Sequence, residues 1–472
     1  MKLYYICIFA ILTLFSCVKD NKADTNYAYF GGEIINPGNN YVVLSKSGKT
    51  IDTVKLDYRN RFLYKFENLE GGLYTFHHGG EIQLVLLEPQ DSLFFRLNTI
   101  EFDESLVYTG RGDKKNNYLI NEFLTNELQE KSIYKFCQLN PEMYLKRIDS
   151  LKFVKEKNLK LFEDRYETSE LFQKIAKANI NFNYYISKEV YPFIHYGREK
   201  NSILKSLPDD FYAYRKDIDY NNSFYKDNHY YSKFIKHSFN NLALSEHYKH
   251  NDKRFFNRKS LCYTLDKLDL IDSLIVNPEI KNELLHSYTV NYLAKSADTD
   301  GNDKLLASFL NKSSDEKSKE SLERFVSMLN VTKNGSTFPD VTVVNYNNVE
   351  LNLKTVINRP TVITFWSHLY YDHFKESHYK LKELRLKYPE VNFISINIDN
   401  YDVSKVRKSL TEKHFPVKNE YVFKTPNASK EFLAVQAMTK TILVDKHQTI
   451  VNSNANIFSS RFEQDILGLI NR

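Results

Sequence analysis

Residues 359–399 read RPTVITFWSHLYYDHFKESHYKLKELRLKYPEVNFISINID, and this stretch decides the fold of the C-terminal part of the chain. It opens with an unbroken apolar run over residues 361–366, which predicts a buried strand. Apolar residues at helical spacing over 374–386 predict a helix. The run at 391–399 predicts a second buried strand. Strand, helix and strand in this order are typical of an α/β sheet.

The segments on either side extend the same pattern. Further predicted elements are a hairpin at 341–351, a helix at 403–413, strands at 438–445 and 449–451, and a closing helix at 462–470. This order, with Phe365-Trp366 and the late Leu443-Val444-Asp445, resembles the thioredoxin-like fold of TlpA-type (redoxin) periplasmic disulfide reductases. The resemblance covers residues 331–472. It implies an active site at the start of the first helix and a cis-proline before the third strand.

The residues at these implied positions do not fit the chemistry of the family. Tyr370 and His373 occupy the positions of the Cys-x-x-Cys pair, and Thr439 occupies the position of the cis-proline. Residues 331–472 contain no cysteine. Disulfide exchange needs a thiolate that attacks sulfur, so we expect no redox catalysis. Because a cis bond without proline costs about 3 kcal/mol, we also expect a trans bond at Thr439.

Polar residues around the same helix start allow a second interpretation, a metal site. The weak candidate ligands are His368, Asp372, His373 and His378. Zinc requires three or four converging ligands, and this spacing does not ensure convergence. A solvated polar loop is the simpler interpretation, and we expect neither a metal nor a cofactor.

The N-terminus predicts a membrane anchor. Residues 1–17 read MKLYYICIFAILTLFSC, with one lysine before an apolar run that is too short to span a membrane. The ending Leu14-Phe15-Ser16-Cys17 resembles the lipobox of bacterial lipoproteins. The resemblance implies that Cys17 is acylated and that residues 18–26 form a tether. No aspartate follows Cys17 directly, so we expect the outer membrane, with the protein facing the periplasm or the cell surface.

Glycine usage divides the rest of the chain. Ten of the 14 glycines lie between Gly31 and Gly112. Residues 27–112 alternate between short apolar runs and turn signals, which predicts an antiparallel β-sandwich. This zone resembles a β domain of unknown function that precedes thioredoxin-like domains in anchored lipoproteins. Residues 113–330 show helical periodicity, with a helix start at Asn277-Pro278-Glu279. We therefore expect a multidomain chain with a β-sandwich, an α-helical domain and a thioredoxin-like domain.

Two cysteines lie in the helical zone. Cys137 and Cys262 have no motif around them, so either a disulfide or two buried thiols is consistent with the sequence.

Composition limits the function classes. A net charge of +6 over 472 residues lacks the dense basic clusters of a nucleic-acid-binding protein, and we expect no nucleic-acid partner. The leading interpretation is an envelope lipoprotein that binds or scaffolds an envelope protein or peptide through a catalytically degenerate thioredoxin-like domain. The alternatives are a TlpA/redoxin-type thiol-disulfide oxidoreductase or antioxidant protein, and a metal-dependent function at the histidine cluster.

Overall fold

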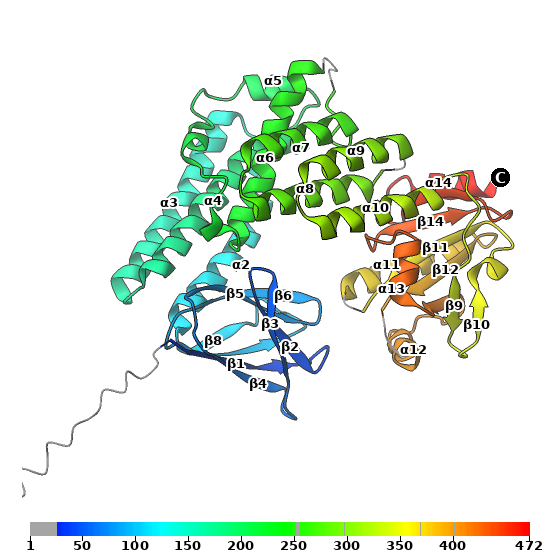
Figure 1. The fold of residues 1–472 in the computed structure, drawn as a ribbon, viewed down its shortest axis with the longest axis horizontal. Helices are drawn as coiled ribbons and strands as arrows, with labels where there is room; N and C mark the ends of the chain where they lie inside the picture. The colour runs from blue at the N-terminus through cyan, green and yellow to red at the C-terminus, as the bar shows by residue number, and fades with distance from the viewer. Residues whose placement is uncertain (1–25, 252–254, 297, 369, 400–402) are drawn as a thin grey trace, which may run out of the picture. The chain divides into compact units, whose positions relative to one another are not determined.

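The computed structural model describes residues 26–251, 255–296, 298–368, 370–399 and 403–472. The predicted leader at 1–17 and the predicted tether, except for its last residue, lie outside the described residues. The chain forms two compact units (Figure 1). Among the described residues, the first unit contains those from 26 to 133 together with Ser150–Asn181, and the second contains Tyr134–Asp149 and those of Phe182–Arg472.

Eight strands form two four-stranded sheets in the first unit. They are β1 (Ala28–Ile35), β2 (Tyr41–Lys46), β3 (Lys49–Lys55), β4 (Arg61–Phe66), β5 (Gly72–His78), β6 (Glu81–Leu87), β7 (Ser92–Asn98) and β8 (Val107–Arg111). The sheet orders are β4-β1-β7-β8 and β3-β2-β5-β6. Side chains from both sheets share one core, whose centre is a cluster of phenylalanines at positions 30, 62, 76 and 95.

One strand pair corrects the predicted antiparallel sandwich. Strands β1 and β7 are parallel, with Tyr29 opposite Ser92 and Ile35 opposite Asn98. The other pairs in these two sheets are antiparallel. A parallel pair needs a long crossover, and the four strands of the other sheet lie between β1 and β7 in the chain, together with β4. Alternation of apolar residues does not encode strand direction, so the sequence pattern could not reveal this pair.

Gly32 on β1 lies against the Phe95 ring. A Cβ atom at this position would lie 2.8 Å from three carbons of that ring. The glycine therefore allows close packing at the centre of the sandwich, where a side chain would push Phe95 away.

Nine helices follow among the described residues. They are α2 (Asp113–Phe136), α3 (Pro141–Arg165), α4 (Glu170–Ile194), α5 (Lys200–Lys205), α6 (His229–His250), α7 (Leu261–Leu274), α8 (Pro278–Leu293), α9 (Thr299–Lys312) and α10 (Glu316–Val331). The helix start predicted at Asn277 is confirmed, because its side chain accepts hydrogen bonds from the backbone N–H groups of Glu279 and Ile280 at 3.0 and 3.2 Å. This satisfies two donors that the first turn leaves free.

Tyrosine and phenylalanine rings pack on one another in the helical part of the second unit. Tyr185 stacks on Tyr214 with 4.1 Å between the ring centroids. Beside this pair, the fully buried Glu189 accepts hydrogen bonds from the Tyr214 hydroxyl and from Arg215. Pairing and hydrogen bonding compensate the desolvation of this buried carboxylate.

The C-terminal part of the second unit contains one mixed sheet with helices. Its elements are β9 (Thr342–Asn345), β10 (Glu350–Asn352), β11 (Thr361–Trp366), α11 (Tyr371–Lys387), β12 (Asn392–Asn397), α12 (Val403–Glu412), β13 (Glu420–Phe423), α13 (Pro426–Phe432), β14 (Lys440–Val444), β15 (Ile450–Asn456) and α14 (Phe462–Ile470). The strand order is β10-β9-β13-β12-β11-β14-β15.

Strand directions in this sheet confirm a thioredoxin-like arrangement. Strands β11 and β12 are parallel and are joined by α11, while β14 and β15 pair antiparallel beside β11. Strand β13 and helix α13 were not predicted from the sequence. Strand β13 has only four residues, all buried, and one of them is Glu420, so the sequence offers no apolar run long enough to predict a strand.

Different helices cover the two faces of this sheet. Leu381 and Leu384 of α11 and Ile466 and Leu469 of α14 pack on one face, in the same cluster as Val362. Ile363 and Phe365 point to the other face, where Leu433, just after α13, joins the core. Because neighbouring residues of a strand face opposite sides, a run that is apolar throughout must be covered on both faces.

Among the described residues, no helix is long and apolar enough to cross a membrane.

Candidate functional site

The loop after β11 is held by one carboxylate. The Ser367 hydroxyl donates to Asp399 Oδ1 at 2.5 Å, and the backbone N–H of His368 donates to Asp399 Oδ2 at 2.7 Å. The His368 ring places Nδ1 2.9 Å from the same Oδ2 and Nε2 2.7 Å from the Ser409 hydroxyl. The ends of β11 and β12 and a residue of α12 are therefore linked through His368 and Asp399.

Hydrogen bonds also set the ionisation of Asp399. Burial raises the pKa of this carboxyl, but hydrogen bonds from the His368 and Ser367 side chains and from the His368 backbone lower it. Their net effect holds the pKa of Asp399 below its usual value. The group is therefore a carboxylate at neutral pH and acts here as an acceptor that orders the loop.

The two positions that the resemblance assigned to redox cysteines differ in exposure. Tyr370 precedes the first residue of α11, and 56% of its surface is exposed. His373 is half-buried in the first turn, with its ring 5.7 Å from the Phe458 ring. Both ring nitrogens of His373 are buried without a hydrogen-bond partner among the described residues. Burial lowers the pKa of His373, and the nearby His378 adds to the effect.

His378 belongs to the core. Its Nδ1 donates to the Phe374 carbonyl at 2.8 Å, and its Nε2 lies 3.4 Å from Glu420, which is fully buried. The ring packs against Trp366 and Phe415. These contacts satisfy the imidazole within the protein.

The four candidate ligands near the helix start therefore have different surroundings. His368 binds Asp399 and Ser409, His378 binds Glu420, and Asp372 is exposed in the first turn of α11. Among the described residues, the side chains whose potential ligand atoms do converge lie elsewhere, at the ends of α6 and α7.

Thr439 lies in an exposed turn directly before β14. No cis peptide bond occurs among the described residues. The next residue, Lys440, is buried, and its ammonium donates to the carbonyls of Leu433 and Ala434 at 2.9 and 3.1 Å. Burial lowers the pKa of Lys440 to about 8.

Neither cysteine of the helical zone forms a disulfide. Cys137 is buried, but Cys262 is exposed in the first turn of α7, so the alternatives of a disulfide or two buried thiols are both wrong for Cys262. A sequence without a motif around a cysteine does not show which face of a helix the residue occupies.

A cavity of about 770 Å³ lies among α6, α7 and α8 and the segments beside them. This volume is in the range of small-molecule sites. Among the described lining residues, one side chain is acidic, Asp298, and five are basic: Lys236, Arg258, Lys259, Lys267 and Lys295. Asp298 already caps α9 by accepting from the Gly301 N–H at 3.1 Å. The lining is therefore predominantly cationic.

Lys267 is the most buried cation of this cavity. Its ammonium lies 4.0 Å from the centroid of the Tyr263 ring and 4.8 Å from that of Tyr288. Rings at these distances attract a cation through their quadrupoles. Burial, with repulsion from Arg258 and Lys295, lowers the pKa of Lys267 to about 7. Sequence reasoning missed this site because its basic residues are scattered over residues 236–295 and converge only in the fold.

No protein-family model and no curated protein matches this chain. Solved structures are similar over a limited part of it. A proposed thiol-disulfide oxidoreductase from Bacteroides vulgatus is 17% identical with a TM-score of 0.26, over 29% of this chain and 98% of that one. A proposed thiol:disulfide interchange protein DsbE from Chlorobium tepidum gives the same four values. A thiol:disulfide interchange protein from Bacteroides sp. is 14% identical with a TM-score of 0.25, over 29% of this chain and 91% of that one. The thioredoxin-like assignment of the C-terminal sheet is based on its strand order and register.

Proposed function

We propose that this protein is a lipid-anchored binding protein of the cell envelope, with a thioredoxin-like domain that does not exchange disulfides. The loss of redox chemistry is supported by the residues at the helix start. A phenol at position 370 and an imidazole at position 373 cannot hold a mixed disulfide. Anchoring at Cys17, in the outer membrane and facing the periplasm or the cell surface, is supported by the lipobox-like ending of residues 1–17.

The ligand that we propose is a small anion bearing carboxylate or phosphate groups. The observation that carries this proposal is the cavity among α6, α7 and α8, with five basic side chains and one acidic one in its described lining. Like charges gathered around a concave space focus an electrostatic potential that attracts the opposite charge. Tyr288 and Tyr292 in the same lining offer rings and hydroxyl groups to the rest of the ligand.

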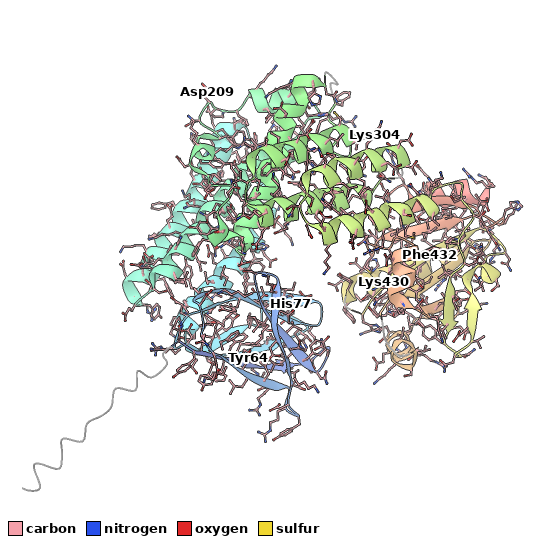
Figure 2. All side chains as sticks on the ribbon, in the orientation of Figure 1. Tyr64, His77, Asp209, Lys304, Lys430 and Phe432 are labelled. Atoms are coloured by element: carbon pink, nitrogen blue, oxygen red, sulfur yellow. The ribbon has the colours of Figure 1, made fainter. Side chains whose placement is uncertain are left out.

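Calorimetric titration of the purified full chain with inorganic phosphate and with citrate tests this assignment. We expect one anion to bind per chain, with affinity that falls as salt is added, because the attraction is screened. Lys267→Met should weaken binding about tenfold or more, equivalent to about 1.4 kcal/mol. The control is Lys304→Met, which removes an exposed lysine of α9 outside the cavity lining (Figure 2). The proposal would be contradicted if neither anion binds, or if the Lys267→Met variant binds an anion as tightly as the wild type does.

A further inference from the structure

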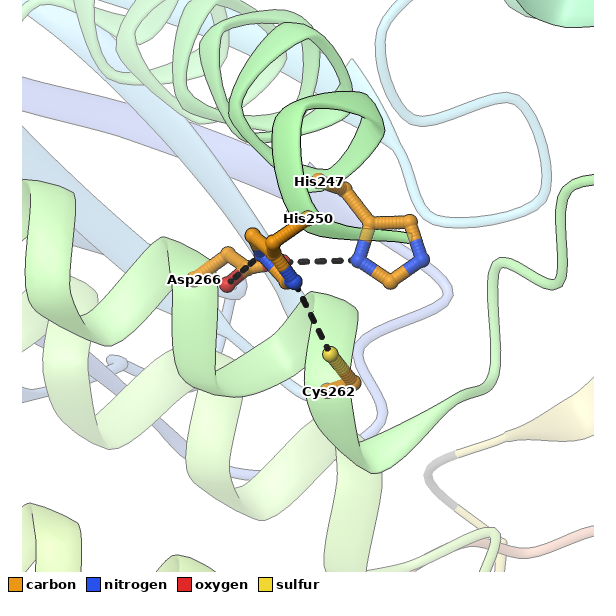
Figure 3. Close-up of side chains that lie close together, drawn as sticks. All are labelled: His247, His250, Cys262 and Asp266. Atoms are coloured by element: carbon orange, nitrogen blue, oxygen red, sulfur yellow. Dashed lines mark hydrogen bonds and ion pairs between the residues drawn. The ribbon is translucent and has the colours of Figure 1, made fainter. Parts of the chain in front are cut away.

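Four side chains with metal-binding atoms converge where α6 ends and α7 begins. His247 and His250 lie in the last turn of α6, and Cys262 and Asp266 lie in the first two turns of α7. One potential ligand atom from each of the four lies within 4.8 Å of the others. Figure 3 shows the four side chains pointing toward one another from the two helices.

The helical spacing explains the convergence. Residues three or four apart lie on one face of a helix, so His247 and His250 point the same way, as do Cys262 and Asp266. The Ser260 hydroxyl accepts from the Tyr263 N–H at 3.3 Å and begins α7 at this point. Anionic groups are favoured in the first turn of a helix, where Cys262 lies, because the helix dipole is positive there.

The contacts among these residues already hold the rings in position. Asp266 Oδ2 lies 2.8 Å from His247 Nδ1, and Asp266 Oδ1 lies 2.9 Å from His250 Nε2. The other ring nitrogen of His250 lies 3.9 Å from Cys262 Sγ. The outer nitrogen of His247, Nε2, lies 2.9 Å from the Asn251 side-chain amide. With a metal on Nδ1, Nε2 would carry the ring proton, and the Asn251 amide would turn its oxygen toward it, which is the outer hydrogen bond that orients ligating histidines.

We propose that His247, His250, Cys262 and Asp266 bind one divalent transition-metal ion of the zinc type. Thiolate and imidazole donors suit zinc, whereas calcium and magnesium prefer sites made of oxygen atoms. Ligand atoms around tetrahedral zinc lie about 3.3–3.6 Å apart, given bonds of about 2.0–2.3 Å. Small side-chain rotations therefore bring the four atoms to that spacing from their present separation of at most 4.8 Å.

Charge and accessibility agree with this assignment. A thiolate and a carboxylate together neutralise a divalent ion; binding releases the thiol proton, while a neutral imidazole binds through its unprotonated nitrogen and keeps its N–H. His250 and Cys262 are exposed, so an ion reaches the site from solvent, whereas His247 is buried and anchors it. With four protein ligands the site is of the structural kind, and the ion would join α6 to α7 across residues 251–260.

Metal titration of the purified full chain tests the proposal. The protein is first treated with a chelator and dialysed. Zinc titrated against a competing chelator should bind with one ion per chain and raise the unfolding temperature, because only the folded state assembles all four ligands. Cobalt in place of zinc should give an absorption band from charge transfer between thiolate and metal. Cys262→Ser should abolish that band, and both Cys262→Ser and His250→Gln should weaken zinc binding tenfold or more.

The variants are chosen so that folding does not confound the result. Cys262 and His250 are exposed, and their replacements preserve approximate size. Cys137→Ala removes the other cysteine of the helical zone and should leave the cobalt band unchanged. Lys267→Met should also leave it unchanged, which separates this site from the anion cavity. No uptake of one zinc per chain, or equal affinity in the Cys262→Ser variant, would show a hydrogen-bond network without a metal and overturn the proposal.

Discussion

Asp399 receives two contacts from His368, one from the backbone N–H at 2.7 Å and one from the ring Nδ1 at 2.9 Å. The two residues are 31 positions apart in the chain, and they lie at the ends of neighbouring parallel strands. In a thioredoxin-like fold this is the place where the chain passes from the first strand to the catalytic helix. Here a carboxylate orders that passage, and no thiol is present to be activated.

Replacing this carboxylate should destabilise the C-terminal domain. Asp399→Asn exchanges an acceptor of several hydrogen bonds for an amide that cannot accept at both ends, so we expect a loss of about 1–3 kcal/mol in the free energy of unfolding. Urea denaturation measures it. Asp372→Asn, at an exposed position of α11, is the matched control and should change stability little.

The pH dependence of this loss follows from the lowered pKa of Asp399. A group with a lowered folded-state pKa stabilises the protein above its unfolded pKa of about 3.9, and this stabilisation is lost as the pH falls through the folded value. The difference between wild type and Asp399→Asn should therefore be full at pH 6–7 and shrink in acid. A difference that grows in acid would contradict the hydrogen-bonding account.

Lys440 should also make the free energy of unfolding depend on pH, but here the cause is the cost of burying a charged group. Burial lowers its pKa from 10.5 to about 8, so between these values the unfolded chain binds more protons than the folded one. Stability contributed through this group therefore rises with pH from about 8 to about 10.5, by at most about 3–4 kcal/mol. Comparing wild type with Lys440→Met across this window isolates the effect. Lys430→Met, which replaces a half-buried lysine of α13 (labelled in Figure 2), is the matched control for the loss of a lysine side chain.

The purified full chain should not reduce insulin or a model disulfide at rates typical of thioredoxins. Cys137→Ala and Cys262→Ser exclude any contribution of the two thiols in the helical zone. Introducing Tyr370→Cys with His373→Cys should give feeble activity at best until Thr439→Pro is added, because nucleophilic attack and alignment of the substrate are separate requirements. Thioredoxin-like rates in the wild-type protein would overturn this part of the proposed function.

Cys17→Ala should abolish acylation and release the protein from the membrane fraction. The measurement is the mass of the purified protein together with its distribution after detergent extraction. Several acyl chains are needed for stable anchoring, so loss of the acceptor cysteine should have a large effect. The Cys7→Ala variant is the control, since the lipobox resemblance places Cys7 in the part of the leader that is removed. Unchanged mass and extraction in Cys17→Ala would contradict lipidation.

Local signals were sufficient for most individual elements. The buried strands β11, β12 and β14 follow from unbroken apolar runs, and the start of α8 follows from Asn277 and Pro278, because burial and capping depend on neighbouring residues. The absence of cysteine in 331–472 is likewise a property of the sequence, and it alone argues against disulfide exchange there.

Tertiary structure decided what lies together. The parallel pairing of β1 with β7, the cationic lining around Lys267, and the convergence of His247 with Asp266 all join residues that are distant in the chain. Composition and periodicity describe which face of an element is apolar, but they contain no information about which other element packs there. The sequence by itself determined the secondary-structure elements and the absence of redox cysteines from residues 331–472. Strand direction and the convergence of distant side chains depend on the packing of the whole chain, so only the tertiary structure determined the two candidate sites.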